Sequence, residues 1–430
     1  MLNLQLPRGL GRAARASLVA VAVAAVASAA WQTLDWGDAD HKKMGKALNK
    51  YFAEKTSEKD REKARQEILG DLAKFGKKKG AKGEEESIQA ALASCFDLGR
   101  ALAYSNDLKN TRGGKAAAVT VEFGGESIEY TLSLPAAYKP GSAPLPVLLC
   151  VPGMRDGKPV SGMTFLQEQM LEPALRDGAV LAAVNMPAEH ERWSVVKDEN
   201  GAGGLFSLMA VYSDIVRTLS VDCDRVFVVG REQGAAPAIE LGARYPQLFA
   251  GVAALAGDIG AVPAGNFCNL PSFLQGGANS STFEEQNKQL GYNNCTIKAD
   301  ATAADLWSWA EQTRRVANPA KVVLQPGPLK TYNAYWLRIP PTEGVQGSIT
   351  AVADRGSNTI KIDSAEVLSM TVFLNDAIVD LSKPITFVLN GREQQQRVAR
   401  SVDDMLSLIS RGTSDPGRLY TAQVALDFPR

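Results

Sequence analysis

Hydrophobic residues recur every three or four positions along the N-terminal part of the chain. The pattern runs through residues 39–54, 58–75 and 84–104, and it predicts three amphipathic helices. Between the last two, the stretch KKKGAKGEEE (77–86) places glycines between blocks of opposite charge, so we expect an exposed helix–helix connection there. Residues 30–110 are therefore predicted to form a helical appendage, which serves as a spacer, a lid or a docking face.

The periodicity changes to two after residue 116. Residues 116–123 and 127–135 alternate around Gly124-Gly125, which predicts a β-hairpin. Beyond the hairpin, strand-length apolar runs at 146–151, 180–184, 225–229, 249–255, 270–275 and 296–297 are interspersed with helix-compatible stretches at 205–219, 235–245, 283–290 and 303–316. Strands that alternate with helices form a doubly wound, mostly parallel sheet, so residues 111–318 are predicted to be an α/β domain.

The pattern changes again near residue 319, where short alternating runs are separated by Gly, Asn-Asp and Asn-Gly turns. Examples are YWLRI (335–339) and PITFVLNG (384–391). One helix is expected at 401–409 and a closing strand at 418–425. Residues 319–430 are therefore predicted to be a separate β-rich, sandwich-like domain, and no motif in it carries chemistry.

Residues 1–29 have the organisation of a secretory signal peptide. Three arginines precede an apolar run at 18–27, and Ala27-Ser28-Ala29 fits a cleavage site with small residues. The apolar run is too short for a comfortable membrane span. We expect an exported protein, periplasmic or extracellular, with no stable membrane span after cleavage; the alternative is an uncleaved N-terminal membrane anchor.

Export raises the question of disulfides, because these bonds persist outside the cytosol. Of the five cysteines, Cys95, Cys150 and Cys223 lie in helical or strand runs and are expected to be buried thiols. Cys268 and Cys295 flank one loop–strand–helix segment and form the best candidate pair. Spacing alone does not establish that they are bonded.

The charge balance and the cofactor motifs exclude several classes of function. The 430-residue chain is 45% hydrophobic and carries 47 Lys and Arg against 47 Asp and Glu, so its net charge does not indicate nucleic acid as a partner. No short-spaced cluster of His, Cys and carboxylate residues indicates a metal site, and no G-x-G-x-x-G fingerprint is present. We therefore expect no metal and no cofactor.

The most informative stretch is 222–258, DCDRVFVVGREQGAAPAIELGARYPQLFAGVAALAGD. Its pattern is strand, tight turn, helix and strand, with glycines at both ends of the turn GREQG (230–234). This stretch resembles the nucleophile elbow G-x-S-x-G of the α/β-hydrolase superfamily. The flanking residues are similar to those of polyhydroxyalkanoate-depolymerase-like esterases and of prolyl-oligopeptidase-type hydrolases. Where the resemblance implies the nucleophilic serine, this chain has Glu232.

The resemblance also implies positions for the rest of the catalytic machinery. The strand at 146–151 usually ends in His-Gly in active members, whereas here Pro152-Gly153-Met154 follows. The backbone amides of Met154 and Gln233 would form the oxyanion hole. The acid and the base would follow the next strands, in the stretches GGAN (276–279) and KADA (298–301), and neither stretch carries the expected residue.

The chain contains only two histidines, His41 and His190, and neither lies at the position that the resemblance implies for the base. His190, in the loop after the strand at 180–184, is the remaining candidate for a base. Related enzymes use an Asp nucleophile at the elbow, but Glu232 is one methylene longer and still needs a base to release the intermediate. The structural interpretation is that Glu232 is an anion at the N-terminus of the helix that runs to Tyr245.

Three functions remain open. The leading hypothesis is an exported α/β-hydrolase-fold protein that has lost hydrolase activity and binds or scaffolds a small molecule, a polymer or a protein. The second is an active serine-type esterase or peptidase with unrecognised catalytic residues. The third is a structural or adhesion protein that acts through its C-terminal β-rich domain.

Overall fold

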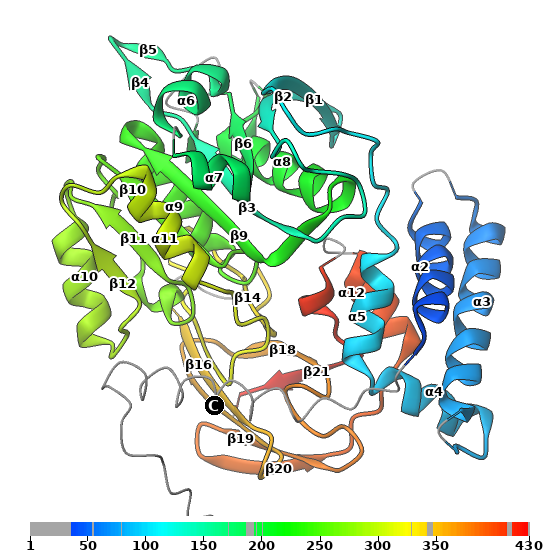
Figure 1. The fold of residues 1–430 in the computed structure, drawn as a ribbon. Helices are drawn as coiled ribbons and strands as arrows, with labels where there is room; N and C mark the ends of the chain where they lie inside the picture. The colour runs from blue at the N-terminus through cyan, green and yellow to red at the C-terminus, as the bar shows by residue number, and fades with distance from the viewer. Residues whose placement is uncertain are drawn as a thin grey trace, which may run out of the picture.

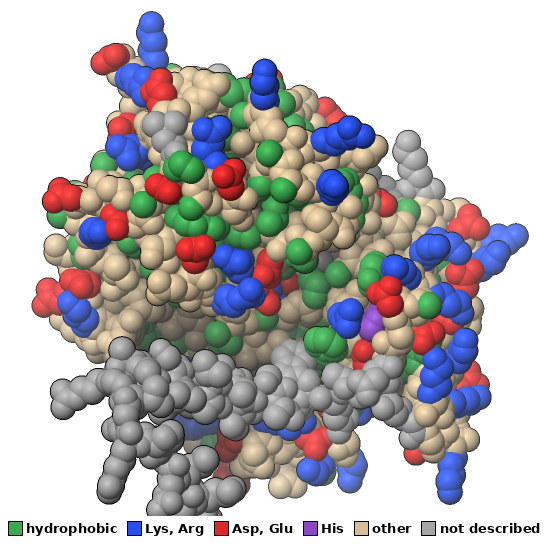
Figure 2. Space-filling model, viewed as in Figure 1, with side chains coloured by type: hydrophobic (Ala, Val, Ile, Leu, Met, Phe, Trp, Pro, Cys, Tyr) green, Lys and Arg blue, Asp and Glu red, His purple; other side chains and the backbone are tan. Residues whose placement is uncertain are grey.

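A computed structural model describes residues 36–53, 56–78, 80–170, 172–185, 193–194, 196–199, 201–327, 329–341, 347–410 and 415–428. The predicted signal peptide and His190 lie outside these residues. Within the described part of the chain, no helix is long and apolar enough to cross a membrane. Figure 2 shows Lys and Arg side chains interspersed with Asp and Glu side chains, most densely over the N-terminal helices.

The N-terminal segment is helical, as its periodicity predicts. Its helices are α2 (Asp38–Phe52), α3 (Glu58–Lys77), α4 (Glu84–Leu92) and α5 (Cys95–Ala103). The single helix expected over 84–104 is wrong, because Ser94 leaves the helical conformation with φ −85° and ψ 70°. The break brings the buried Asp97 to His41 Nε2, at 2.9 Å, and to the Ser94 hydroxyl. A buried carboxylate needs such partners, and they outweigh the helical propensity of the segment.

These helices share one apolar core with a helix from the far end of the chain. Met44 and Leu48 of α2 and Ile68 of α3 belong to the same buried cluster as Met405 and Leu406 of α12 (Val402–Ser410). In Figure 1, α12 lies beside α5. The N-terminal helices are therefore packed against the C-terminal part of the chain, and the boundaries at 110 and 318 stay predictions.

The centre of the molecule is an eight-stranded sheet in the order β1-β2-β6-β3-β9-β10-β11-β12. The strands are β1 (Ala117–Phe123), β2 (Glu126–Ser133), β3 (Leu145–Val151), β6 (Val180–Val184), β9 (Val221–Arg231), β10 (Gly251–Leu255), β11 (Ser272–Gln275) and β12 (Cys295–Ile297). The hairpin β1–β2 and the pair β2–β6 are antiparallel, and every later pair is parallel. This confirms the predicted mostly parallel sheet of an α/β fold.

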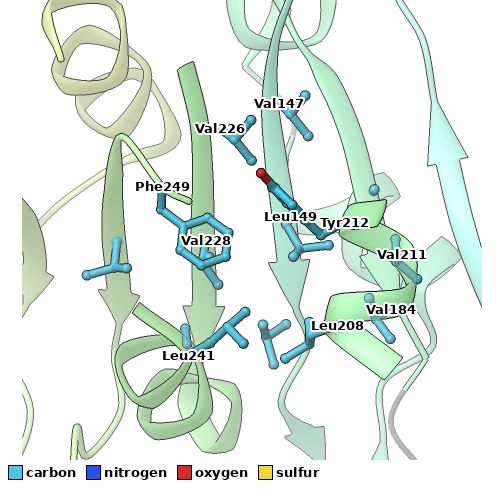
Figure 3. Packing of buried hydrophobic residues seen from close by; sticks show 14 of the residues in the cluster. Val147, Leu149, Val184, Leu208, Val211, Tyr212, Val226, Val228, Leu241 and Phe249 are labelled. Atoms are coloured by element: carbon cyan, nitrogen blue, oxygen red, sulfur yellow. The ribbon is translucent and has the colours of Figure 1, made fainter. Parts of the chain in front are cut away.

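Helices cover both faces of this sheet, and β3 shows how the faces are divided. Val147 and Leu149 pack against α8 (Gly204–Thr218) and α9 (Ala235–Arg244), as Figure 3 shows. The alternate residues Leu148 and Cys150 pack against the opposite layer. That layer consists of α6 (Gly162–Gln169), α7 (Pro173–Gly178) and α11 (Ala303–Gln312). Because side chains alternate along a strand, a fully apolar strand requires cover on both sides.

The C-terminal part consists of two sheets over one core, as expected for a sandwich-like unit. One sheet contains β13 (Lys321–Leu324), β16 (Ser348–Asp354), β17 (Thr359–Ala365), β19 (Ile385–Leu389) and β20 (Arg392–Gln396); the other contains β14 (Asn333–Ala334), β15 (Leu337–Arg338), β18 (Ser369–Leu374) and β21 (Ala422–Asp427). Both sheets contribute to the same buried cluster. The strand expected at 335–339 is shortened to β15, because residues 335–336 form the turn after β14, with Tyr335 at a positive φ of 51°.

The candidate disulfide is not formed, since all five cysteines are free thiols. Cys268 interacts with the Tyr292 hydroxyl and Cys295 with Ser272, and burial raises the pKa of both thiols. Cys95 and Cys150 are buried as predicted, whereas Cys223 is partly exposed.

Candidate functional site

The turn after β9, where the sequence resemblance implies a nucleophile elbow, is a sharp strand–turn–helix junction with one residue in the left-handed region. The strand ends at Arg231, Glu232 has φ 53°, and the 3-10 turn Glu232–Gly234 leads directly into α9. A side chain in this left-handed region costs roughly 1–2 kcal/mol. The strained conformation is therefore present although the serine is not.

The two glycines of GREQG are required by close packing. A Cβ on Gly230 would lie 2.0 Å from the carbonyl oxygen of Gly234, and a Cβ on Gly234 would lie 2.1 Å from that of Val151. Real Cβ atoms do not approach carbonyl oxygens this closely, so no other residue fits without a backbone shift. These contacts explain why the glycine pattern of the elbow persists around Glu232.

The Glu232 side chain lies over Gly153. A Cβ built on that glycine would be 2.8 Å from Glu232 Cβ and 2.9 Å from Oε2. The carboxylate is 38% exposed, and its Oε1 is 3.8 Å from Nε of Arg231. It accepts no hydrogen bond from a backbone amide among the described residues, and the helix N-cap is Gly234. Glu232 thus lies in the 3-10 turn that leads into α9, and its expected role as an anion at the N-terminus of that helix stays a prediction.

One of the two predicted oxyanion amides already has an acceptor inside the protein. The N–H of Met154 donates to Oε1 of Gln233 at 2.9 Å. Met154 begins the small hairpin formed by β4 (Met154–Arg155) and β5 (Lys158–Pro159), which projects at the edge of the molecule in Figure 1. An oxyanion would have to displace the Gln233 side chain to reach this amide.

One acidic residue that the motif comparison did not single out follows a glycine that packs against the Glu232 turn. Asp258 follows β10, and a Cβ on the preceding Gly257 would be 2.1 Å from the carbonyl oxygen of Glu232. Hydrogen bonds from the N–H of Gly260 and from Asn279 Nδ2, at 2.9 and 2.8 Å, hold the pKa of Asp258 below its usual range. Asn279 occupies the stretch where the resemblance implies the acid. The sequence feature that could have identified Asp258 is its position directly after an apolar, strand-length run.

The stretch implied for the base holds an ion pair and no imidazole. Lys298 Nζ is 2.5 Å from Oδ1 of Asp305, which also caps α11 through Thr302. His41 is buried among the N-terminal helices, bonded to Asp97. The described residues therefore place no histidine near the elbow, and His190 lies outside them.

The described residues also contain no group of three or more His, Cys, Asp or Glu side chains arranged to hold a metal ion. Among the cavities that the described residues line are ones of about 410, 450 and 590 Å³, and Glu232, Gln233 and Met154 line none of these.

Comparison with known proteins gives distant likenesses only. No protein-family model matches the sequence, and no curated protein is detectably similar to it. Solved structures with similar folds include a thermostable esterase (15% identity, TM-score 0.37), an S-formylglutathione hydrolase from Agrobacterium tumefaciens (13%, 0.37) and a fluorophosphonate-binding serine hydrolase from Staphylococcus aureus (12%, 0.35).

The matches cover 46%, 47% and 46% of this chain, and 63%, 97% and 97% of the respective structures. The chain thus spans less than two thirds of the thermostable esterase. Likenesses at this level do not establish a shared activity.

Proposed function

We propose that this chain is an exported pseudoenzyme: an α/β-hydrolase-fold protein that does not hydrolyse esters or peptides at its elbow and acts in binding or scaffolding. The observation that carries the proposal is the elbow itself. Glu232 occupies the strained nucleophile position, and the amide that would stabilise an oxyanion is bonded to Gln233.

The chemistry of acyl transfer supports this proposal. A serine hydrolase needs a hydroxyl on the elbow, an imidazole that takes its proton, a carboxylate that orients the imidazole, and two free amides. The elbow offers a carboxylate in place of the hydroxyl, and the base stretch offers the Lys298–Asp305 pair. The Asp258 carboxylate accepts a hydrogen bond from Asn279, and the described residues place no histidine there for it to orient.

A second candidate function is an active esterase or peptidase with a catalytic set that the motif does not reveal. Two observations favour it: the turn keeps its left-handed residue, and Asp258 directly follows Gly257, which packs against the Glu232 carbonyl. Backbone strain is often stored where it serves function.

A fluorophosphonate probe separates the two candidates. We expect the mature protein to show no stoichiometric labelling of a serine, and no turnover of p-nitrophenyl acetate above a heat-denatured sample. An active serine hydrolase of the same fold serves as positive control. Active-site-directed labelling of one serine, located by peptide mapping, would establish the second candidate.

Restoring the nucleophile alone should not restore hydrolysis. In Glu232→Ser the base is still missing, and the members of a triad act as a unit. We expect p-nitrophenyl acetate turnover far below about 1 per second, a rate typical of enzymes. The combined change Glu232→Ser and Gln233→Ala frees the Met154 amide and is the matched control. Multiple turnovers at such a rate in either variant would show that a base is present, with His190 as the first residue to change.

A further inference from the structure

The five-stranded C-terminal sheet ends in a strand whose outer edge is open. β20 pairs with β19 on one side and is the last strand of this sheet. All its residues are exposed, on whichever face of the sheet their side chains lie. In Figure 1, β19 and β20 lie at the bottom of the molecule, at the end remote from the large sheet. We propose that β20 pairs antiparallel with β20 of a second copy of this chain, which joins the two sheets into one.

The neighbouring strands show which backbone groups of β20 point outward. The N–H of Thr386 in β19 donates to the carbonyl oxygen of Asn358, just before β17, at 3.0 Å. Because backbone groups alternate in direction along a strand, the odd-numbered residues of β19 face β20, where they lie opposite the even-numbered residues. The N–H and C=O groups of Glu393 and Gln395 therefore point away from the sheet, and no described strand lies there to bond them.

The charges along this edge are self-complementary in one register. With Gln395 opposite Gln395 of the second copy, Glu393 lies opposite Arg397 on both sides of the two-fold axis. These are outward-pointing positions, where two strands exchange backbone hydrogen bonds. Gln394 and Gln396 also face each other, and their amides supply both donors and acceptors.

The other registers lack this match. Pairing centred on Glu393 would oppose two carboxylates, and pairing centred on Gln394 would leave Glu393 and Arg397 without a charged residue opposite. Within one copy the two charged side chains are about 13 Å apart along the extended chain, so they do not pair with each other. Both are exposed. The second copy supplies the partners that its own chain does not.

The strand lacks the devices that keep sheet edges apart. It contains no proline or lysine, and its pairing with β19 runs to both ends without a bulge. The opposite edge of the sheet is closed, because Asn269 Nδ2 donates to the carbonyl oxygen of Lys321 in β13 at 2.7 Å, and the N–H of Gln325 donates to Asn266 Oδ1 at 2.8 Å. Pairing through β20 alone therefore ends in a two-fold dimer and does not continue into a filament.

The short edge sets the expected affinity. Interfaces below about 1,200 Å² are typical of transient complexes. We expect a dimer with a dissociation constant of about 10 µM to 1 mM, which weakens as salt screens the exposed ion pairs. The pairing concerns the C-terminal sheet only, so it stands whether or not the elbow is catalytically silent, and the fluorophosphonate assay does not bear on it.

Charge reversal tests the pairing. Sedimentation velocity of the mature protein at low salt, over a concentration series, should show a reversible monomer–dimer equilibrium. Glu393→Arg and Arg397→Glu each place like charges opposite each other, so each should weaken dimerisation by about tenfold or more. The two changes combined restore opposite charges and should recover the affinity of the parent protein. The matched control is Arg392→Glu, which changes the net charge as Arg397→Glu does, but at a position with no charged residue opposite, and should dimerise like the parent protein.

A single cysteine measures the register. Opposite residues of a hydrogen-bonded antiparallel pair have Cα atoms about 5.5 Å apart, within the range of a disulfide, whereas diagonal neighbours are about 7–8 Å apart. Gln395→Cys should therefore form an intermolecular disulfide under mild oxidation, and Gln394→Cys should do so at least about tenfold more slowly. The parent protein, with its five native thiols, gives the background.

The variants are compared at equal melting temperature, and the two single reversals are independent, so the unfolding of one leaves the other as the test. A parent protein that stays monomeric throughout the series would overturn the proposal. So would a dimer that both single reversals leave intact, a combined reversal that fails to recover, or faster cross-linking through Gln394→Cys.

Discussion

At the scale of single residues, the left-handed conformation of Glu232 has a measurable consequence. At an ordinary helical position, Gly is less stable than Ala by about 1 kcal/mol. At Glu232, with φ 53°, we expect the order to be reversed. Glu232→Gly relieves strain of about 1–2 kcal/mol and loses about 0.5–1 kcal/mol in chain entropy, so it should be more stable than Glu232→Ala by up to about 1.5 kcal/mol.

Urea unfolding of the two variants measures the difference directly. As a matched control, the parent protein is compared with Ala236→Gly, a substitution one turn away in α9. There the glycine variant should have the lower free energy of unfolding. A Glu232→Ala protein that is more stable than Glu232→Gly would show that the elbow is not held in the left-handed conformation.

At the scale of elements, a reciprocal capping box stabilises the N-terminus of α11. Thr302 Oγ1 accepts a hydrogen bond from the N–H of Asp305, and Asp305 accepts one from the N–H of Thr302 in return. Bonds from Lys298 and from Thr302 lower the pKa of Asp305 to about 2. We expect Thr302→Ala to lower the free energy of unfolding by about 1 kcal/mol, since the N–H of Asp305 loses its acceptor. Thr302→Ser keeps the hydroxyl, so its free energy of unfolding should stay within a few tenths of a kcal/mol of the parent protein's. Thermal melts of the three proteins measure both differences.

At the scale of the whole molecule, one buried ion pair joins distant parts of the chain. Arg315, just after α11, bonds to Asp415 in the C-terminal segment and to Asp224 of β9. Asp415→Asn leaves the buried Arg315 with only the partly exposed Asp224 as its counter-charge, so it should lower the free energy of unfolding at pH 7 by about 3 kcal/mol. The exposed Asp363→Asn is the control and should have almost no effect.

The pH dependence of the same pair has a definite sign. Burial opposes the charged form of Asp415, but the charge and hydrogen bonds of Arg315 lower its pKa below the usual value. Its contribution is therefore complete above about pH 4, the ordinary pKa of Asp, and is lost as the pH falls further. Denaturant melts between pH 7 and pH 3 should show a steeper loss of stability in the parent protein than in Asp415→Asn. Parallel pH profiles for the two proteins would contradict this role of the pair.

The sequence by itself determined which segments form the central sheet and where the elbow lies. The strand at 180–184, the hairpin around Gly124-Gly125 and the strand–turn–helix at 222–245 all match the structure, because each depends on local periodicity and turn chemistry. That Glu232 occupies the nucleophile position of an elbow stays a prediction from the motif spacing.

The tertiary structure decided what depends on residues far apart in the chain. Ser94 interrupts the predicted helix because Asp97 forms a hydrogen bond with His41, which lies 56 residues earlier in the chain. Similarly, the Gln233 side chain accepts a hydrogen bond from the N–H of Met154, which lies 79 residues earlier. The packing of α12 against the N-terminal helices and the free state of Cys268 and Cys295 have the same origin. Burial and pairing are properties of the folded neighbourhood, and local periodicity carries no information about which distant segment supplies the partner.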